Sequence, residues 1–294
     1  MSYDLFFYKQ KGSEISRDKI SQYLSDNLVQ ANEEDSQWFF ENKDTEVYFS
    51  FEFNELEGDF EPDEELEPIE NFDDTNFSFN LNFMRPSFFG IEAFNFVKQF
   101  CADLNLYVLN PQSASEQPYK PERQEQFDYW NKTNLWSSKD HFEEMQCCYL
   151  REEESNKIWE YNSNRQNLQI KLGEEYFVPK IFFFKTKQGN QPITLTIWTE
   201  HIPIVLPTTD YILLTREYKN FFKTIKDTVL ISRATLLNSF GDYFENFEFL
   251  DCKIIHQDKA EKVKVKFNSI KTEQILENFA ERLAIENLYN AKPA

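Results

Sequence analysis

The sequence is poor in glycine, with 6 in 294 residues. Loops that cradle phosphate groups depend on glycine, and the chain contains neither G-x-G-x-x-G nor G-x-x-x-x-G-K-[ST]. It also lacks G-x-S-x-G and H-E-x-x-H, the patterns of α/β-hydrolases and zinc proteases. The sequence therefore predicts no cofactor site and no set of catalytic residues.

Cysteine is scarce as well. The 4 cysteines show no C-x-x-C spacing, and Cys147 and Cys148 are adjacent, which would strain a disulfide between them. We expect reduced thiols. No apolar run approaches the roughly 18 residues of a membrane span, and the first residues lack a basic region followed by a long apolar one. These absences together predict a cytoplasmic protein that makes no contact with a membrane.

There are 3 histidines, and they lie far apart in the sequence. Glu200 and His201 are adjacent between two apolar runs and could form an acid–base pair. Neighbouring residues of an extended chain point to opposite faces, however, which favours a structural role for His201. An enzyme of unknown class with a site near Glu200 and His201 is kept as an alternative.

Positive charge is scarce in the first part of the chain. Residues 1–130 hold 28 Asp and Glu against 9 Lys and Arg, whereas residues 131–294 hold 23 against 22. Such a surface repels nucleic acids and anionic membranes and attracts basic proteins. The other interpretation is that the charge serves solubility alone.

The acidic residues are densest in the segment 54–76, which has eleven acids and no Lys or Arg. Self-repulsion and two prolines oppose regular structure there, so we expect a long surface loop. Its acids are the candidate partner-binding residues: Glu55, Glu57, Asp59, Glu61, Asp63, Glu64, Glu65, Glu67, Glu70, Asp73 and Asp74. Carboxylates at positions 1, 3, 5 and 12 from Asp59 imitate a calcium loop, but Glu64 replaces the glycine needed at position 6. We predict no metal site.

Residues 1–110 have the pattern of one α+β domain. Alternating apolar residues predict strands over 3–8, 47–53 and 77–83, and a stripe at helical spacing predicts a helix over 89–104. A strand at 106–109 would complete an arrangement that resembles a split β-α-β unit. Three prolines among polar residues then predict a linker or surface loop over 111–125.

A second α+β domain is expected over 126–294, organised around a central sheet at 176–214. Residues 181–184 and 193–198 would pair as a hairpin, because Gly189 and Asn190 tolerate the positive φ angles of a tight turn. Four helices are expected after the sheet, with start signals at Thr215, Ser232, Asp258 and Thr272. The fold class is thus α+β, with an antiparallel, phenylalanine-rich sheet covered by helices in the second domain.

The opening Met-Ser-Tyr-Asp-Leu-Phe-Phe-Tyr-Lys resembles that of small bacterial proteins of unassigned activity, some of which are similar to immunity proteins of polymorphic toxins. The resemblance covers about nine residues and implies a bacterial cytoplasmic protein. It assigns no functional residues.

These observations favour a non-enzymatic protein-binding module that neutralises a basic protein, such as a toxin domain, through an acidic surface. We expect no direct binding of nucleic acid, and the sequence does not indicate an oligomeric state. A mimic of nucleic acid is a third possibility, since an acidic face can occupy a nucleic-acid-binding protein.

Overall fold

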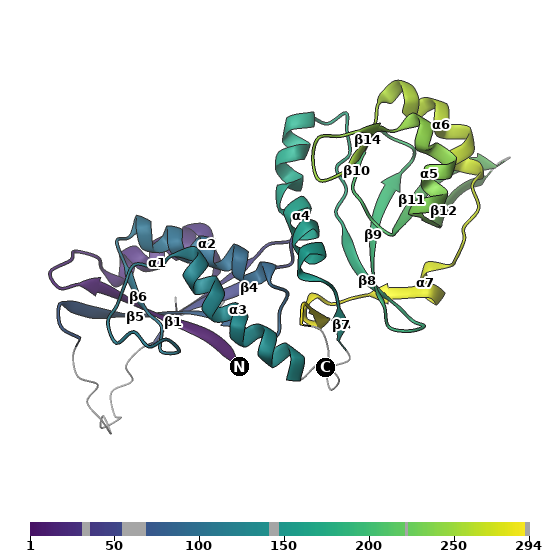
Figure 1. Ribbon diagram of the computed structural model, residues 1–294. Coiled ribbons are helices and arrows are strands. Elements are labelled where there is room, and N and C mark those ends of the chain that lie inside the picture. Colours follow the sequence, from purple (N-terminus) through teal and green to yellow (C-terminus); the bar gives the residue numbers. More distant parts are fainter. Residues whose placement is uncertain (31–35, 55–68, 141–146, 221–222, 292–294) are drawn as a thin grey trace. The chain divides into compact units, whose positions relative to one another are not determined.

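The computed structural model describes residues 1–30, 36–54, 69–140, 147–220 and 223–291. The chain divides into two compact units, one of Met1–Phe142 with Pro293–Ala294 and the other of Glu143–Lys292. Each unit has its own sheet and its own helices (Figure 1).

The N-terminal unit is built on a six-stranded sheet in the order β2-β3-β4-β5-β1-β6, in which every pair is antiparallel. Its strands are β1 (Ser2–Gln10), β2 (Val29–Gln30), β3 (Gln37–Glu41), β4 (Tyr48–Phe53), β5 (Phe72–Asn82) and β6 (Tyr107–Leu109). The strands expected at 3–8, 47–53 and 106–109 are present within about two residues. The strand expected at 77–83 is also present, but as β5 it begins five residues earlier, at Phe72.

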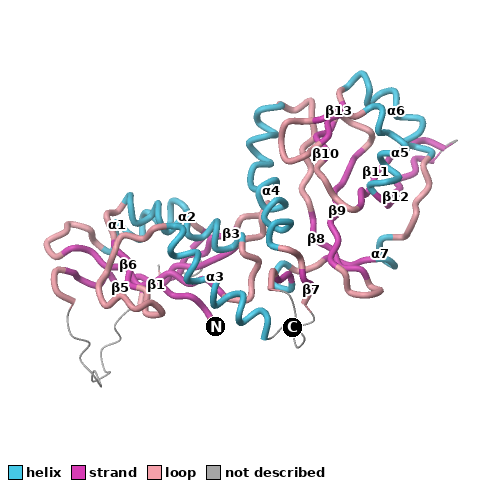
Figure 2. Tube along the Cα trace, in the orientation of Figure 1, coloured by secondary structure: helices cyan, strands magenta, loops and turns pink. Residues whose placement is uncertain are grey.

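Helices α1 (Arg17–Asn27) and α2 (Phe88–Asp103) cover one face of this sheet (Figures 1 and 2). Alternate strand residues turn toward them: the ring of Phe7 lies 4.9 Å from that of Phe100, and the ring of Phe51 lies 5.2 Å from it, both edge to face. Edge-to-face contact of large rings is the geometry that aromatic quadrupoles favour. The abundance of phenylalanine thus becomes a ring-packed core between sheet and helices.

Helix α3 (Arg123–Asp140) belongs to the same unit, which corrects the expected division at 111–125. Trp130 is fully buried and packs on Gly90 of α2, whose absent side chain leaves the room for the indole. The buried Tyr3 hydroxyl donates to Gln126 of α3 at 2.9 Å and accepts from Asn110 at 2.8 Å. These buried contacts tie the proline-containing segment and α3 to the first sheet, so the segment is not a linker between domains.

The C-terminal unit has a five-stranded sheet in the order β12-β11-β9-β8-β15. Its strands are β8 (Phe182–Thr186), β9 (Pro192–Thr199), β11 (Tyr211–Asn220), β12 (Lys223–Ser232) and β15 (Ala280–Arg282). Strands β8 and β9 form the expected hairpin, with Gly189 and Asn190 at φ +86° and +54°. All pairs are antiparallel except β9 and β11, which run parallel.

Smaller elements complete this unit. A three-stranded sheet joins β10 (Ile204–Leu206), β14 (Lys253–Ile255) and β13 (Glu245–Asn246), and a two-stranded one joins β16 (Leu288–Tyr289) to β7 (Cys148–Tyr149). The remaining elements are α4 (Glu152–Leu172), α5 (Arg233–Phe240), α6 (Gln257–Ser269), α7 (Leu276–Phe279) and the 3-10 turns Gly241–Tyr243 and Ile285–Asn287. Trp198 of β9 is buried between Phe240 of α5 and Phe267 of α6, which places both helices against the same face of the sheet.

The helix expected after Thr215 is wrong, because this stretch continues β11 and returns as β12. Arg216 shows why the hairpin prevails. Its guanidinium bonds Asp227 across the hairpin and donates to the backbone oxygens of Phe267, Asn268 and Ile270 at the end of α6. Tertiary contacts of this kind override local helical spacing.

Two of the expected C-terminal helices have other bounds than the sequence predicted. The helix expected after Thr272 is a single turn, α7, followed by β15, because Ala280–Arg282 pairs with β8. The helix expected from Asp258 is present as α6, but it begins one residue earlier, at Gln257, after His256. The helix expected after Ser232 is α5, and the Ser232 hydroxyl accepts from the N–H of Thr235 as a cap should.

The α+β class inferred from the sequence is confirmed by this arrangement of helices and largely antiparallel sheets. In the ranges that the structure describes, no helix is both long enough and apolar enough to span a membrane.

Candidate functional site

The first candidate site is the face of the N-terminal sheet that α1 and α2 leave uncovered. Side chains alternate along a strand, so the residues before and after each inward-facing phenylalanine point to this face. It carries Asp4, Phe6 and Tyr8 from β1, Phe39 and Glu41 from β3, Glu52 from β4, and Asp74, Ser78 and Asn80 from β5. We call this set the acidic sheet face.

The carboxylates of the acidic sheet face are held by cross-strand hydrogen bonds. Asp4 accepts from the Asn80 amide at 2.7 Å, and Glu52 accepts from the Gln37 amide at 2.8 Å. Burial and the neighbouring Asp74 carboxylate, to which it is hydrogen-bonded, raise the pKa of Tyr8 to about 12, so this phenol stays protonated and donates. The face therefore presents ordered acceptors rather than freely rotating chains.

Positive charge is nearly absent from these strands. Within the bounds of β1 to β6 the only Lys or Arg is Lys9, whose ammonium group turns to the backbone oxygen of Ile15. At the β6 edge, the ammonium group of Lys120 lies 3.9 Å from the centre of the Tyr107 ring. The centre of the acidic sheet face thus keeps its carboxylates unopposed by a strand cation.

Three of the eleven predicted partner-binding acids lie in the described residues. Glu70 is exposed in the turn before β5, while Asp73 and Asp74 are inside β5, paired with Lys9 and Tyr8 of β1. Asp73 and Asp74 are therefore sheet residues and not part of a loop reaching to 76, because β5 begins at Phe72. The other eight lie outside the described residues: Glu55, Glu57, Asp59, Glu61, Asp63, Glu64, Glu65 and Glu67.

Asp4, Glu41 and Glu52 were not singled out from the sequence. The signal that finds Asp4 and Glu52 is strand alternation, because each lies between two aromatic or aliphatic residues that face the helices. Glu41 ends its strand, between Phe40 and Asn42, and alternation marks it on one side alone.

Glu200 and His201 occupy the two central positions of a tight turn between β9 and β10. Both have positive φ angles, +47° and +52°, and the N–H of Ile202 donates to the oxygen of Thr199 at 3.1 Å, as in a type I′ turn. Glu200 is exposed, whereas the His201 ring packs 5.9 Å from the Phe267 ring. Partial burial, with Lys264 nearby, lowers the pKa of His201. The charge of Glu200 partly offsets this lowering of the His201 pKa. Neither residue lines the cavity described next.

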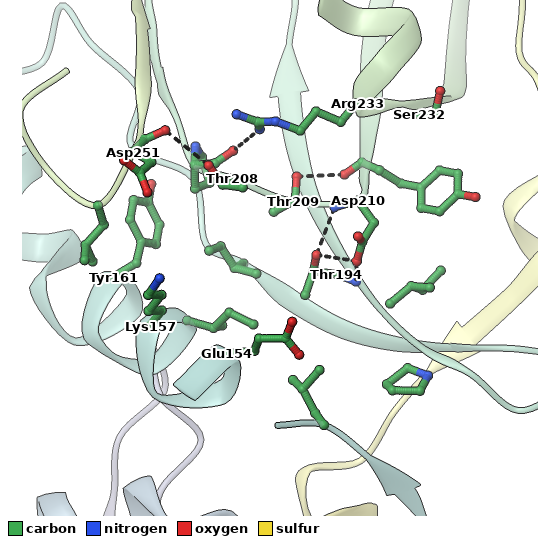
Figure 3. A pocket seen from close by; sticks show the side chains of 18 of the residues that line it. Glu154, Lys157, Tyr161, Thr194, Thr208, Thr209, Asp210, Ser232, Arg233 and Asp251 are labelled. Atoms are coloured by element: carbon green, nitrogen blue, oxygen red, sulfur yellow. Dashed lines mark hydrogen bonds between the residues drawn. The ribbon is translucent and has the colours of Figure 1, made fainter. Parts of the chain in front are cut away.

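A cavity of about 810 Å³ lies within the C-terminal unit (Figure 3). It is bordered by the first half of α4, the beginnings of β9 and β11, the start of α5 and the turn before β14. Its apolar wall includes Leu150, Ile158, Ile181, Ile193 and Leu250. A volume of this size is in the range of small-molecule sites.

The polar groups of the cavity come from two helices, from β9 and from the turn before β11. Figure 3 shows Arg233 reaching in from α5, Glu154 from α4, and Thr194 and Asp210 from the strand ends. Asp210 accepts from both the N–H and the hydroxyl of Thr194 at 2.8 Å, and the Asp210 N–H donates back to that hydroxyl at 2.9 Å. The bond from Arg151 to Glu154 lowers the pKa of the Glu154 carboxyl, and burial lowers the pKa of Arg233.

The turn at the rim of the cavity has an unusual backbone. Leu250 and Asp251 both have positive φ angles, +45° and +56°, and a leucine is rarely found in that region. The turn is closed by the N–H of Cys252 donating to Phe249 at 3.0 Å, and the Thr208 hydroxyl binds the oxygen of Asp251 at 3.1 Å. Strained backbone of this kind gathers at ligand sites.

In the part of the chain that the structure describes, no three His, Cys, Asp or Glu side chains are grouped so as to hold a metal ion. The four cysteines are buried free thiols, and burial raises the pKa of Cys252 to about 12. Comparisons with protein-family models, with curated proteins and with solved structures give no match for this chain.

Proposed function

We propose that this chain is a non-enzymatic protein-binding protein that docks a basic protein partner on the acidic sheet face. The observation that carries the proposal is the charge pattern of that face: Asp4, Glu41, Glu52 and Asp74 point away from the helices. The one Lys or Arg within the described strands of this sheet, Lys9, donates instead to the backbone oxygen of Ile15. Like charges held together raise the local potential, which speeds the encounter with a basic surface.

Aromatic groups on the same face supply the contact that charge alone cannot. The Phe39 side chain is 40% exposed, and Phe6 and Tyr8 are half-buried beside Asp4 and Asp74. Aromatic anchors surrounded by polar groups are the usual source of slow dissociation in protein complexes. The cross-strand hydrogen bonds of Asp4 and Glu52 also reduce the ordering that binding would require.

The partner expected is a protein with a basic surface. Eight further acids lie in the segment 55–68, outside the described residues, and they add to the negative charge that attracts a basic partner. The first nine residues resemble the opening of small bacterial proteins of unassigned activity, some of which are similar to immunity proteins. This favours a toxin domain as the partner, which the acidic sheet face would neutralise by covering its active surface.

The proposal is tested with a triple variant, Glu41→Gln, Glu52→Gln and Asp74→Asn, which removes three charges and keeps the shape and one acceptor oxygen of each side chain. A matched control replaces three exposed glutamates of the C-terminal unit, Glu160, Glu174 and Glu175, by glutamine. A stoichiometric partner is first captured from the native host with the unaltered chain, then purified, and its association rate with each protein is measured at low and at physiological salt.

We expect the triple variant to associate about tenfold more slowly at low salt and to lose most of its salt dependence, with the control unchanged. Equal rates for all three proteins, or the recovery of no stoichiometric partner, would refute the proposal. A partner that is released from DNA or RNA by this chain would instead identify the face as a nucleic-acid mimic.

A further inference from the structure

We propose that the cavity of the C-terminal unit binds a small organic anion, a molecule with a carboxylate or phosphate group on an apolar body. The proposal concerns a different unit from the acidic sheet face and goes beyond protein binding. It rests on the hydrogen-bond donors of the side chains that line the cavity.

Hydrogen-bond donors are the groups available to a guest. Lys157 lines the cavity with an exposed ammonium group that makes no hydrogen bond within the described residues, and its charge contributes, after the bond from Arg151, to lowering the pKa of Glu154. Arg233 is half-buried, has five donors and donates one bond, to the backbone oxygen of Pro207 at 3.0 Å. A partly buried guanidinium is ordinarily paired with a carboxylate, so these two cations favour an anionic guest.

The carboxylates of the cavity do not meet this demand. Glu154 is already paired with Arg151, which lies outside the cavity lining, and Asp210 receives the N–H and the hydroxyl of Thr194 on Oδ2. Burial lowers the pKa of Arg233, and the charge of Asp210 partly offsets this larger effect. Asp251 and Lys157 are exposed to solvent, so Arg233 is the half-buried charged group of the lining that keeps donors for a guest.

The start of α5 also borders the cavity, through Ser232, Arg233 and Ala234. The N–H and the hydroxyl of Ser232 already donate to the Glu273 carboxylate, at 3.1 Å and 3.2 Å, so the donors that this end of the helix offers to a guest are those of the Arg233 side chain. The apolar wall of Ile158, Ile181 and Ile193 accommodates a hydrocarbon body, which separates this site from one for a fully polar ion.

The experiment uses four probes with one hydrocarbon chain and different head groups: hexanoate, hexyl phosphate, hexanol and hexylamine. Binding to the full chain is measured by calorimetry and by shifts of amide resonances in α4 and α5. We expect hexanoate or hexyl phosphate, or both, to bind, with hexanol weaker and hexylamine weakest. The stronger of the two anions identifies the head group as carboxylate or phosphate.

The variants Lys157→Gln and Arg233→Gln should each weaken binding of the better anion by about tenfold, the effect of one charge-assisted hydrogen bond. Lys171→Gln, on the last turn of the same helix as Lys157, is the matched control and should bind normally. Because Lys157 is exposed and unbonded in the described structure, its replacement leaves folding intact even if Arg233→Gln does not.

Three results would overturn the inference: no binding of either anion, equal binding of the anions and hexylamine, or unchanged binding by Lys157→Gln and a folded Arg233→Gln. The triple variant of the acidic sheet face should bind the anion as the unaltered chain does, so failure of one proposal leaves the other testable.

Discussion

At the scale of single residues, Gly90 shows how a missing side chain sets the position of a helix. A Cβ placed there would lie 2.6 Å and 2.7 Å from two ring carbons of Trp130 and 3.0 Å from a ring carbon of Phe127. Neither ring can move without shifting α3, because interiors of proteins are densely packed. The contact between α2 and α3 therefore depends on glycine at this position.

We predict that Gly90→Ala destabilises the N-terminal unit by about 1–3 kcal/mol, because overpacking outweighs the gain in helix propensity of about 1 kcal/mol. The control is Gly241→Ala, which has a negative φ, −54°, and no atom within 4 Å of the new Cβ; it should be neutral or slightly stabilising. Amide hydrogen exchange in α2 and α3 measures the difference. Unchanged protection in Gly90→Ala would contradict this packing argument.

Tyrosine protonation gives a second prediction at this scale. Burial is the first cause that raises the pKa of Tyr8 and of Tyr23 from 10.0 to about 12, with Asp74 and Asp103 adding to it. A raised pKa in the folded state means that stability is full below pH 10 and is lost as pH rises through about 12. Tyr8→Phe and Tyr23→Phe should each reduce this alkaline loss.

The measurement is urea unfolding between pH 9 and pH 12, followed by circular dichroism. Tyr129→Phe, an exposed tyrosine of α3 at 41% exposure, is the control and should leave the alkaline slope as it is. If both tyrosine variants had the slope of the unaltered chain, the two phenols would not be the groups responsible.

At the scale of elements, the turn at Glu200 and His201 is better explained by geometry than by chemistry. Type I′ turns require positive φ at both central residues, and Asn-Gly meets this requirement best. We predict that the double change Glu200→Asn and His201→Gly stabilises the C-terminal unit by up to about 1 kcal/mol. Thermal unfolding measures this shift, and a marked loss of stability would show that the His201 ring is needed against Phe267.

The side chain of Arg216 holds the hairpin of β11 and β12 against the end of α6. It is 9% exposed, is paired with Asp227 at 2.7 Å, and donates to three backbone oxygens at the end of α6. Lysine cannot reproduce this planar fork. We predict that Arg216→Lys costs about 2–4 kcal/mol, measured by urea unfolding.

The control for Arg216→Lys is a substitution of Lys226, which lies on the same hairpin. Lys226 pairs with Glu217, but its side chain is 81% exposed, so Lys226→Gln should cost less than about 0.5 kcal/mol. Similar costs for the two variants would mean that the contacts of Arg216 with α6 carry no weight.

At the scale of the whole molecule, the position of the division between the units can be tested by cutting the chain. Trp130 is completely buried and lies beyond the boundary that composition suggested at 111–125. We predict that a fragment of residues 1–142 folds, whereas a fragment of residues 1–125 does not, because losing a buried tryptophan costs about 3–5 kcal/mol and exposes the face of α2. Dispersion of amide resonances distinguishes the two outcomes, and equally good dispersion would place α3 outside the first core.

The local sequence pattern was sufficient to predict an element where the surroundings of each residue are set by its neighbours in the sequence. Alternation predicted the strands of the first sheet, the stripe of Phe89, Ala93 and Phe96 predicted α2, and Ser232 marked the start of α5. It also indicated where acids gather, though not that Asp73 and Asp74 belong to a strand. Composition alone placed the negative charge in the first part of the chain.

Only the tertiary structure decided the rest, because the deciding partners are far away in sequence. Strand β11 exists because β9 and β12 pair with it and Arg216 holds α6, and α3 joins the first unit because Gly90 receives Trp130. The cavity brings Lys157 and Arg233 together from segments that share no motif. Hydrophobic spacing predicts which side of a helix or strand is buried, but it does not identify the element that packs against that side. Both candidate sites depend on which elements pack together.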